Sequence, residues 1–160
     1  MNSKIKKIIK KKSKSKIICL TAYSKNIAEI IDNHADIVLV GDSLGSVLYN
    51  YDTTRKVTLK MMIEHTKSVR MGIKKSLLVI DLPYKTYRNK SEALKNSKIA
   101  LKETKCDAVK IESNSKNFKI IQEIVKAKIP VMGHIGYTPQ FKKKFKVEGK
   151  NMKETRKLIK

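Results

Sequence analysis

The sequence predicts an α/β fold built around a parallel β-sheet. Five short apolar runs alternate along the chain with stretches in which apolar residues recur at helical spacing. Continuous apolar runs are typical of strands buried on both faces, and strand–helix alternation is typical of parallel sheets with right-handed crossovers. These patterns fit two architectures, an open doubly wound sheet and a closed (β/α)8 barrel, and do not decide between them.

The first two expected strands occupy residues 17–23 (IICLTAY) and 36–41 (DIVLVG), and we expect both to be buried. Between them, isoleucines and an alanine recur at helical spacing over residues 27–31, which predicts a helix. In residues 43–57 the apolar residues follow neither strand nor helix spacing, so this stretch is interpreted as a longer loop.

Thr58 is expected to cap a helix over residues 59–73, because a threonine hydroxyl accepts a hydrogen bond from the first helical turn. Residues 76–82 then predict a third strand, which Pro83 ends. Ser91 is expected to cap the helix that follows.

Residues 108–112 (AVKIE) and 130–135 (PVMGHI) predict the fourth and fifth strands, with a helix over residues 118–125 between them. A turn-rich segment, residues 136–140, follows the fifth strand. Asn151 is expected to cap a final helix.

The chain has 160 residues, of which 41% are hydrophobic, so one folded domain over residues 17–160 is expected. Residues 1–16 contain eight lysines and are interpreted as a solvated, partly disordered leader without the apolar stretch of a secretory signal. No apolar run approaches the roughly 18 residues that cross a bilayer. Cys19 and Cys106 are expected to be small core residues of a cytoplasmic protein.

The net charge of +23 rests on 33 lysines and 4 arginines against 14 acidic residues. Arginine is the side chain best suited to reading bases and gripping phosphate, so its scarcity argues against a specific nucleic-acid partner. Dispersed lysines, with abundant Ile and Asn, indicate an A/T-rich coding bias and predict only weak, non-specific polyanion binding. Glycine-rich dinucleotide and P-loop motifs are both missing.

Polar side chains follow the ends of four expected strands. They are Asp42 and Ser43 after the second strand, Asp81 in the third, Lys110 and Glu112 in the fourth, and His134 in the fifth. Because the C-terminal ends of parallel strands meet at one edge, we expect these side chains to lie close together. Lys110 and Glu112 must share a face of their strand, as would Val40 and Asp42 if the second strand ran on.

Three carboxylates at one edge repel each other unless a cation lies among them. Oxygen ligands with room for water and substrate suit Mg²⁺, so Asp42, Asp81 and Glu112 are candidate ligands. Structural interpretations stay open for each residue alone. Asp42 and Asp81 could be cap or turn residues, Lys110 and Glu112 a salt-bridged pair, and His134 a structural histidine.

The same residues lie in motifs by which the sequence resembles the ketopantoate hydroxymethyltransferase family. In family order, the motifs are IICLTAY, DIVLVGDSLGSVL, YDTTRKVTLKMMIEHTKSV, LLVIDLPY, EALKNS, CDAVKIE, IPVMGHIGYTPQ and FKVEGK, within residues 17–150. VGDSLG together with MGHIGYTPQ is a highly specific pair. The resemblance implies a TIM-type (β/α)8 barrel of the phosphoenolpyruvate/pyruvate superfamily, of which about five of eight βα units are present.

The resemblance also implies site residues. It makes Asp42, Asp81 and Glu112 the Mg²⁺ ligands, and Asp42, Ser43, Asp81 and Lys110 the contacts of a 2-oxo acid substrate. The implied reaction transfers a hydroxymethyl group from 5,10-methylenetetrahydrofolate to 3-methyl-2-oxobutanoate, giving 2-dehydropantoate in pantothenate biosynthesis.

The family's general base is a glutamate on a later strand, which the resemblance places beyond residue 160 together with strands six to eight. No catalytic base is therefore expected within this chain, and His134 has no assigned role. Family members are often decameric, which implies a homo-oligomer. Two alternatives stay open: a non-catalytic remnant that binds polyanions or a partner subunit, and a related Mg²⁺-dependent 2-oxo acid lyase.

Overall fold

The computed structural model describes residues 2–114, 117–142 and 147–159. Five parallel strands form one sheet in the order β1-β2-β3-β4-β5. The strands are β1 (Cys19–Thr21), β2 (Ile37–Val40), β3 (Leu77–Asp81), β4 (Ala108–Glu112) and β5 (Val131–His134). The α-helices are α1 (Ser3–Lys10), α2 (Lys25–Ile31), α3 (Leu44–Tyr49), α4 (Leu59–Gly72), α5 (Lys90–Thr104), α6 (Phe118–Lys126) and α7 (Met152–Ile159). Two 3₁₀ turns, η1 (Thr54–Lys56) and η2 (Pro139–Phe141), follow α3 and β5.

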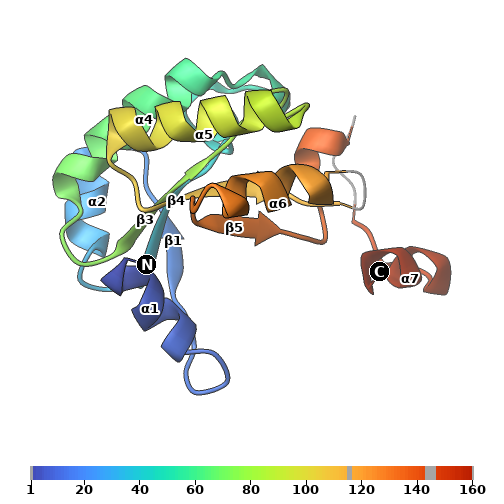
Figure 1. Cartoon of the computed structure of the whole chain (residues 1–160), viewed down its shortest axis with the longest axis horizontal. Coiled ribbons are helices and arrows are strands. Elements are labelled where there is room, and N and C mark those ends of the chain that lie inside the picture. Colours follow the sequence, from blue (N-terminus) through green and yellow to red (C-terminus); the bar gives the residue numbers. More distant parts are fainter. Residues whose placement is uncertain (1, 115–116, 143–146, 160) are drawn as a thin grey trace.

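The strand order decides between the two closures that the sequence left open. A doubly wound sheet reverses its strand order and carries helices on both faces. Here the strands follow one another in chain order, and α2, α4, α5 and α6 lie along the same outer side of the sheet (Figure 1). The arrangement is that of successive βα units of a barrel, as the sequence resemblance implied.

The outer face of the sheet and the inner faces of these helices form the main hydrophobic core. Alternate strand residues point outward into it, namely Val38, Val40, Leu78, Ile80, Val109 and Ile111. Met62 and Val69 of α4, Ala100 of α5 and Ile124 of α6 are buried in the same core. Because side chains alternate along a strand, the residues between these positions all point to the inner face.

The inner face changes from apolar to charged along the strands. At the N-terminal ends, the register rows are Cys19–Ile37–Leu77 and Leu39–Val79–Ala108. At the C-terminal ends, they are Asp81–Lys110–Met132 and Glu112–His134. Parallel pairing in this register therefore gathers the charged residues at one edge of the sheet.

The N-terminal segment is a helix, which corrects the expectation of a partly disordered leader. Asn2 caps α1, since its Oδ1 accepts a hydrogen bond from the backbone N of Lys4 at 2.9 Å. Ile5 and Ile8 lie on one face of α1 and pack against the apolar row of the inner face. Lys11, just past the helix, pairs with Asp36 at 2.5 Å. The spacing of Ile5 and Ile8 on one helix face is hard to recognise in the sequence, because lysines occupy most of the neighbouring positions.

Two local expectations for the chain before α5 were wrong. The stretch 43–57 is not a loop throughout, because it contains α3 and η1. Leu44 and Gly45 of α3 are buried, which packs one side of this short helix against the core. The cap of α5 is Asn89, whose side chain accepts a hydrogen bond from Glu92 N at 2.9 Å, and not Ser91. The caps expected at the starts of α4 and α7 are confirmed, since each side chain accepts a hydrogen bond from the helix that follows it.

The first strand is shorter and more exposed than expected. All three residues of β1 are exposed, and in the described part of the chain β1 pairs only with β2. Cys19 is therefore exposed and is not a core residue, whereas Cys106 is buried as expected. An edge strand has a neighbour on one side only, so an apolar run there does not guarantee burial.

Gly72 marks the closest approach of α4 to α2. A Cβ at this position would lie 2.6 Å from the backbone O of Lys25 and 2.9 Å from the Cβ of Ala28. We predict that Gly72→Ala lowers the free energy of unfolding by about 1–3 kcal/mol, because backbone atoms must shift to make room. Urea denaturation measures the change. Gly133→Ala is the control, since a Cβ there meets nothing within 4 Å. Equal losses in the two variants would contradict the close contact.

Candidate active site

Three carboxyl groups are buried where β2, β3 and β4 end. Asp81 and Glu112 are the last residues of β3 and β4, and each is 1% exposed. Asp42 lies two residues after β2 and is 5% exposed. These are the three carboxylates for which the sequence predicted a common edge.

Asp42 reaches this edge through a turn and not by strand alternation. The strand ends at Val40, which points outward into the helix-covered core, so Asp42 does not continue its face. The chain turns at once, with Leu44 N donating to Gly41 O and Gly45 N donating to Asp42 O, both at 3.1 Å. The condition under which Val40 and Asp42 would share a face, a strand that runs on to residue 42, is therefore not met.

Lys110 forms an ion pair with its register partner on the neighbouring strand. Its Nζ lies 2.5 Å from Asp81 Oδ2, and the lysine is not paired with Glu112 as one interpretation of the sequence had it. The second oxygen of the same carboxylate, Asp81 Oδ1, is buried and has no hydrogen-bond partner among the residues that the structure describes. One carboxylate oxygen is thus left for a further ligand.

Gln140 of η2 joins two of the carboxylates. Its Nε2 donates to Asp42 Oδ2 at 2.8 Å, and its backbone N donates to Glu112 Oε2 at 3.0 Å. Tyr87 donates its hydroxyl proton to the amide oxygen of Gln140. The sequence predicts Gln140 only as part of a turn, without these contacts. Its place in the MGHIGYTPQ motif was the signal that could have drawn attention to it.

Ser43 and His134 lie beside the carboxylates. Ser43 Oγ shares a hydrogen bond of 2.8 Å with the hydroxyl of Tyr23, a residue to which the sequence assigned no role. His134 Nδ1 lies 3.8 Å from Glu112 Oε1. Every residue of the predicted site is therefore at this edge of the sheet.

Burial dominates the electrostatics of the site. It raises the pKa of Asp81 to about 7, with Lys110 acting to lower that pKa and Asp42 to raise it. Burial also raises the pKa of Glu112 to about 8, with the charge of Asp42 adding to the effect. The pKa of Asp42 is raised by burial too, although the hydrogen bond from Gln140 lowers it. The carboxylates thus lack enough positive charge to ionise readily together.

The donor set fits a hard divalent cation. In residues 2–114, 117–142 and 147–159, no three His, Cys, Asp or Glu side chains already stand in a metal-binding arrangement. Lys110 and Gln140 instead contact Asp81, Asp42 and Glu112. The site nevertheless suits Mg²⁺, which prefers oxygen ligands. A bound cation would pair with Asp81 Oδ1 and would reduce the repulsion between the three carboxylates.

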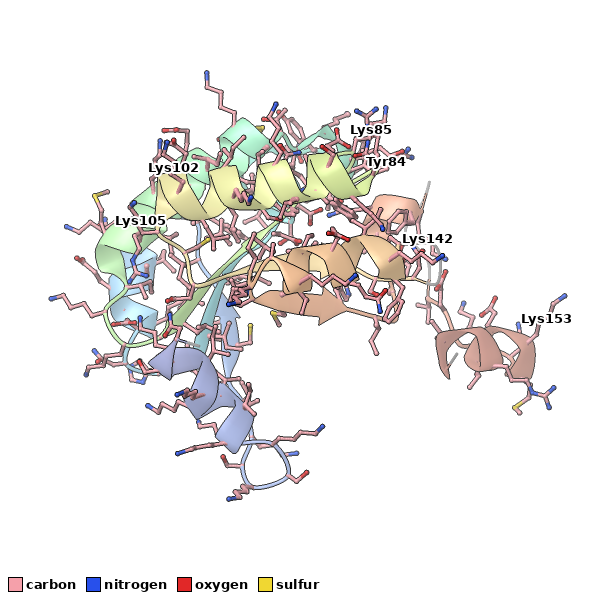
Figure 2. The ribbon with its side chains drawn as sticks, viewed as in Figure 1. Tyr84, Lys85, Lys102, Lys105, Lys142 and Lys153 are labelled. Atoms are coloured by element: carbon pink, nitrogen blue, oxygen red, sulfur yellow. The ribbon has the colours of Figure 1, made fainter. Side chains whose placement is uncertain are left out.

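A cavity of about 330 Å³ is lined in part by Tyr87, the hydrogen-bond partner of Gln140. Its lining includes Tyr84, Lys85, Tyr87, Arg88, Asn117 and Phe141. Figure 2 shows Tyr84 and Lys85 at the same end of the molecule as Lys142, while Lys102 and Lys105 lie at the opposite end. Tyr87 both lines the cavity and donates a hydrogen bond to Gln140, so one side chain adjoins the cavity and the residue that holds the carboxylates.

Comparison with protein-family models finds a match over almost the whole chain. The model of the ketopantoate hydroxymethyltransferase family matches residues 2–160. The chain belongs to this family. Among curated family members, the 3-methyl-2-oxobutanoate hydroxymethyltransferase of Pelagibacter ubique (strain HTCC1062) is 62% identical over 159 residues, covering 99% of this chain. That of Rhizobium etli is 49% identical over 125 residues, covering 78% of this chain.

The chain spans 62% of the length of the first of these hydroxymethyltransferases and 46% of the second. Solved structures confirm the fold. A phosphonopyruvate hydrolase in complex with oxalate and Mg²⁺ matches with a TM-score of 0.67 and 10% identity, over 83% of this chain and 52% of that one. A 2,3-dimethylmalate lyase of the PEP mutase/isocitrate lyase superfamily matches with a TM-score of 0.62 and 12% identity, with the same coverages.

The raised pKa values of Asp81 and Glu112 predict how stability depends on pH. Between the ordinary carboxyl pKa and the raised one, the folded chain holds more protons than the unfolded chain. Without a divalent cation, the free energy of unfolding should therefore fall as pH rises from 5 to 8, by on the order of a few kcal/mol. His134, whose pKa is lowered by burial, opposes this trend over part of the range.

Glu112→Gln removes one of the two carboxyl groups, so the fall in stability between pH 5 and pH 8 should become smaller. Urea denaturation at the two pH values measures it. Glu64→Gln, at an exposed position of α4, is the control and should leave the wild-type slope unchanged. A wild-type chain that is equally stable at both pH values would refute the buried, electrostatically strained cluster.

Proposed function

We propose that this chain carries the metal-binding and 2-oxo acid-binding part of a Mg²⁺-dependent hydroxymethyltransferase. The reaction transfers a hydroxymethyl group from 5,10-methylenetetrahydrofolate to 3-methyl-2-oxobutanoate and gives 2-dehydropantoate, the first step of pantothenate biosynthesis. The observation that carries the proposal is the cluster of Asp42, Asp81 and Glu112, buried at the ends of parallel strands in a member of this family.

In this proposal the three carboxylates hold Mg²⁺, and Asp42, Ser43, Asp81 and Lys110 contact the 2-oxo acid. The bound cation supplies Lewis acidity that polarises the keto group. Asp81 Oδ1, buried and without a hydrogen-bond partner in the described part of the chain, is the oxygen best prepared for the cation. Ser43 Oγ, held by Tyr23, is placed beside Asp42 to donate to a substrate oxygen.

Lys110 balances the negative charge of the site. It contacts Asp81 across the register and is partly exposed on the inner face, where the substrate would lie. When the C3 proton of the 2-oxo acid is removed, negative charge develops toward the carbonyl oxygen. A nearby ammonium group stabilises that charge, and it does so more strongly in a partly buried site than in water.

The setting of the enzyme is also a proposal. We place it in the cytoplasm as a homo-oligomer with small-molecule substrates and no specific nucleic-acid partner. Among the helices that the structure describes, none has the length and apolar character to cross a membrane. The general base that removes the C3 proton is proposed to lie on a later strand, outside residues 1–160.

The first test concerns the metal. The wild-type chain should bind Mg²⁺ in isothermal titration calorimetry, and Asp81→Ala should weaken that binding at least about tenfold, because it removes a direct ligand. Asp52→Ala is the matched control, since Asp52 is exposed and its carboxylate pairs with Lys56. Equal affinity in the wild type and Asp81→Ala would refute the assignment of the site.

The second test concerns catalysis. The purified 160-residue chain should form 2-dehydropantoate at least about 10²-fold more slowly than a complete family member, because general-base assistance is worth about 10²–10⁴-fold. Mg²⁺-dependent product formation is the assay, with deuterium exchange at C3 of the 2-oxo acid reporting proton removal separately. Turnover near that of a complete enzyme would show that a base lies within this chain.

A further inference from the structure

The side chain of Gln140 is fully buried, and each of its polar atoms has a protein partner. Nε2 donates to Asp42 Oδ2 at 2.8 Å and to the backbone O of Leu82 at 3.1 Å. Oε1 accepts the hydroxyl proton of Tyr87. The backbone N of the same residue donates to Glu112 Oε2 at 3.0 Å. A buried amide with all its hydrogen bonds satisfied holds one orientation.

Tyr87 determines which way the amide faces. Burial raises the pKa of Tyr87, and nearby carboxylates raise it further, so its hydroxyl keeps its proton. The hydroxyl donates that proton to Gln140. The partner of that proton must be an oxygen, which directs Oε1 of Gln140 to Tyr87 and Nε2 to Asp42. The chain of contacts runs from Tyr87 through Gln140 to Asp42.

Gln140 bridges strands that are not neighbours. Asp42 follows β2 and Glu112 ends β4, and β3 lies between them. Gln140 comes from η2 after β5, and it holds one oxygen of each of these two carboxylates. Their distance from each other therefore depends on a residue that belongs to neither strand, while Asp81 between them is oriented by Lys110.

We propose that Gln140 is a positioning residue that holds one oxygen of Asp42 and one of Glu112 and so restricts both carboxylates to orientations from which they can turn to Mg²⁺. This role rests on the proposed function of the carboxylate cluster. Gln140 acts through its two carboxylate partners and is not itself a ligand. Groups that orient metal ligands in this way typically change metal affinity about 10–100-fold when they are removed.

The first measurement uses the wild-type chain. The sequence contains two glutamines, Gln122 and Gln140, so labelling glutamine side-chain amides with ¹⁵N gives two pairs of NMR signals. Gln122→Met assigns them, because Gln122 is exposed on α6. The Gln140 pair should exchange slowly with solvent and should shift when Mg²⁺ is added, since Asp42 changes its bonding. The Gln122 pair should do neither.

The second measurement is Mg²⁺ affinity by calorimetry, at a temperature where circular dichroism shows each variant to be folded. Gln140→Met keeps the length of the side chain but removes its amide, and it should weaken binding about 10–100-fold. Tyr87→Phe removes only the hydroxyl that orients the amide and should weaken binding by a smaller factor. Gln122→Met should bind as the wild type does.

A merely structural role gives a different pattern. Gln140→Met would then lower the thermal midpoint but would bind Mg²⁺ with the wild-type constant, and the Gln140 signals would not shift on saturation with Mg²⁺. Either result overturns the positioning role and leaves the proposed function standing. If the wild-type chain itself binds no Mg²⁺, the proposed function is contradicted and the positioning role falls with it.

Discussion

Three carboxyl groups and one lysine ammonium share a buried edge of the sheet, and the chemistry of the molecule depends on this imbalance of charge. Asp42, Asp81 and Glu112 are removed from water, and Lys110 makes direct contact with Asp81. Desolvation disfavours each charged form, and each carboxylate raises the cost of ionising the others. A divalent cation offsets both the desolvation and the repulsion. The same buried carboxylates that lower the stability of the metal-free fold therefore favour binding of such a cation.

The rest of the fold serves to bring these residues together. Sequential parallel pairing places the ends of β2, β3 and β4 side by side, and strand alternation points Asp81, Lys110 and Glu112 to the inner face. The apolar core between the sheet and its covering helices buries most of the hydrophobic side chains and stabilises the fold. On the inner face, α1 packs against the apolar rows at the end of the strands opposite to the carboxylates. Stability and chemistry thus occupy different ends of the same strands, as in other barrels of this type.

Much of this arrangement could be predicted from residues alone. Continuous apolar runs located the strands, and Asp81 and Glu112 fell at the strand ends because local pattern determines where a buried strand stops. The path of Asp42 was not predictable from alternation, since the turn after Val40 depends on the packing of α3. Gln140 was missed for a related reason: its contacts join residues 98, 58, 53 and 28 positions away, and no local pattern records them. The same applies to Cys19, which is exposed because β1 pairs only with β2 in the part of the chain that the structure describes.

Whether a divalent cation binds among Asp42, Asp81 and Glu112 decides the proposed function. The most direct measurement is an anomalous difference map from crystals of the chain soaked in Mn²⁺, which takes the same oxygen ligands as Mg²⁺ and scatters anomalously. We expect a peak in contact with Asp81 Oδ1 and bounded by the other two carboxylates, with Lys110 Nζ moved from its 2.5 Å contact with Asp81. A map with no peak at this edge, and with the Lys110–Asp81 pair intact at saturating Mn²⁺, would contradict the proposed function.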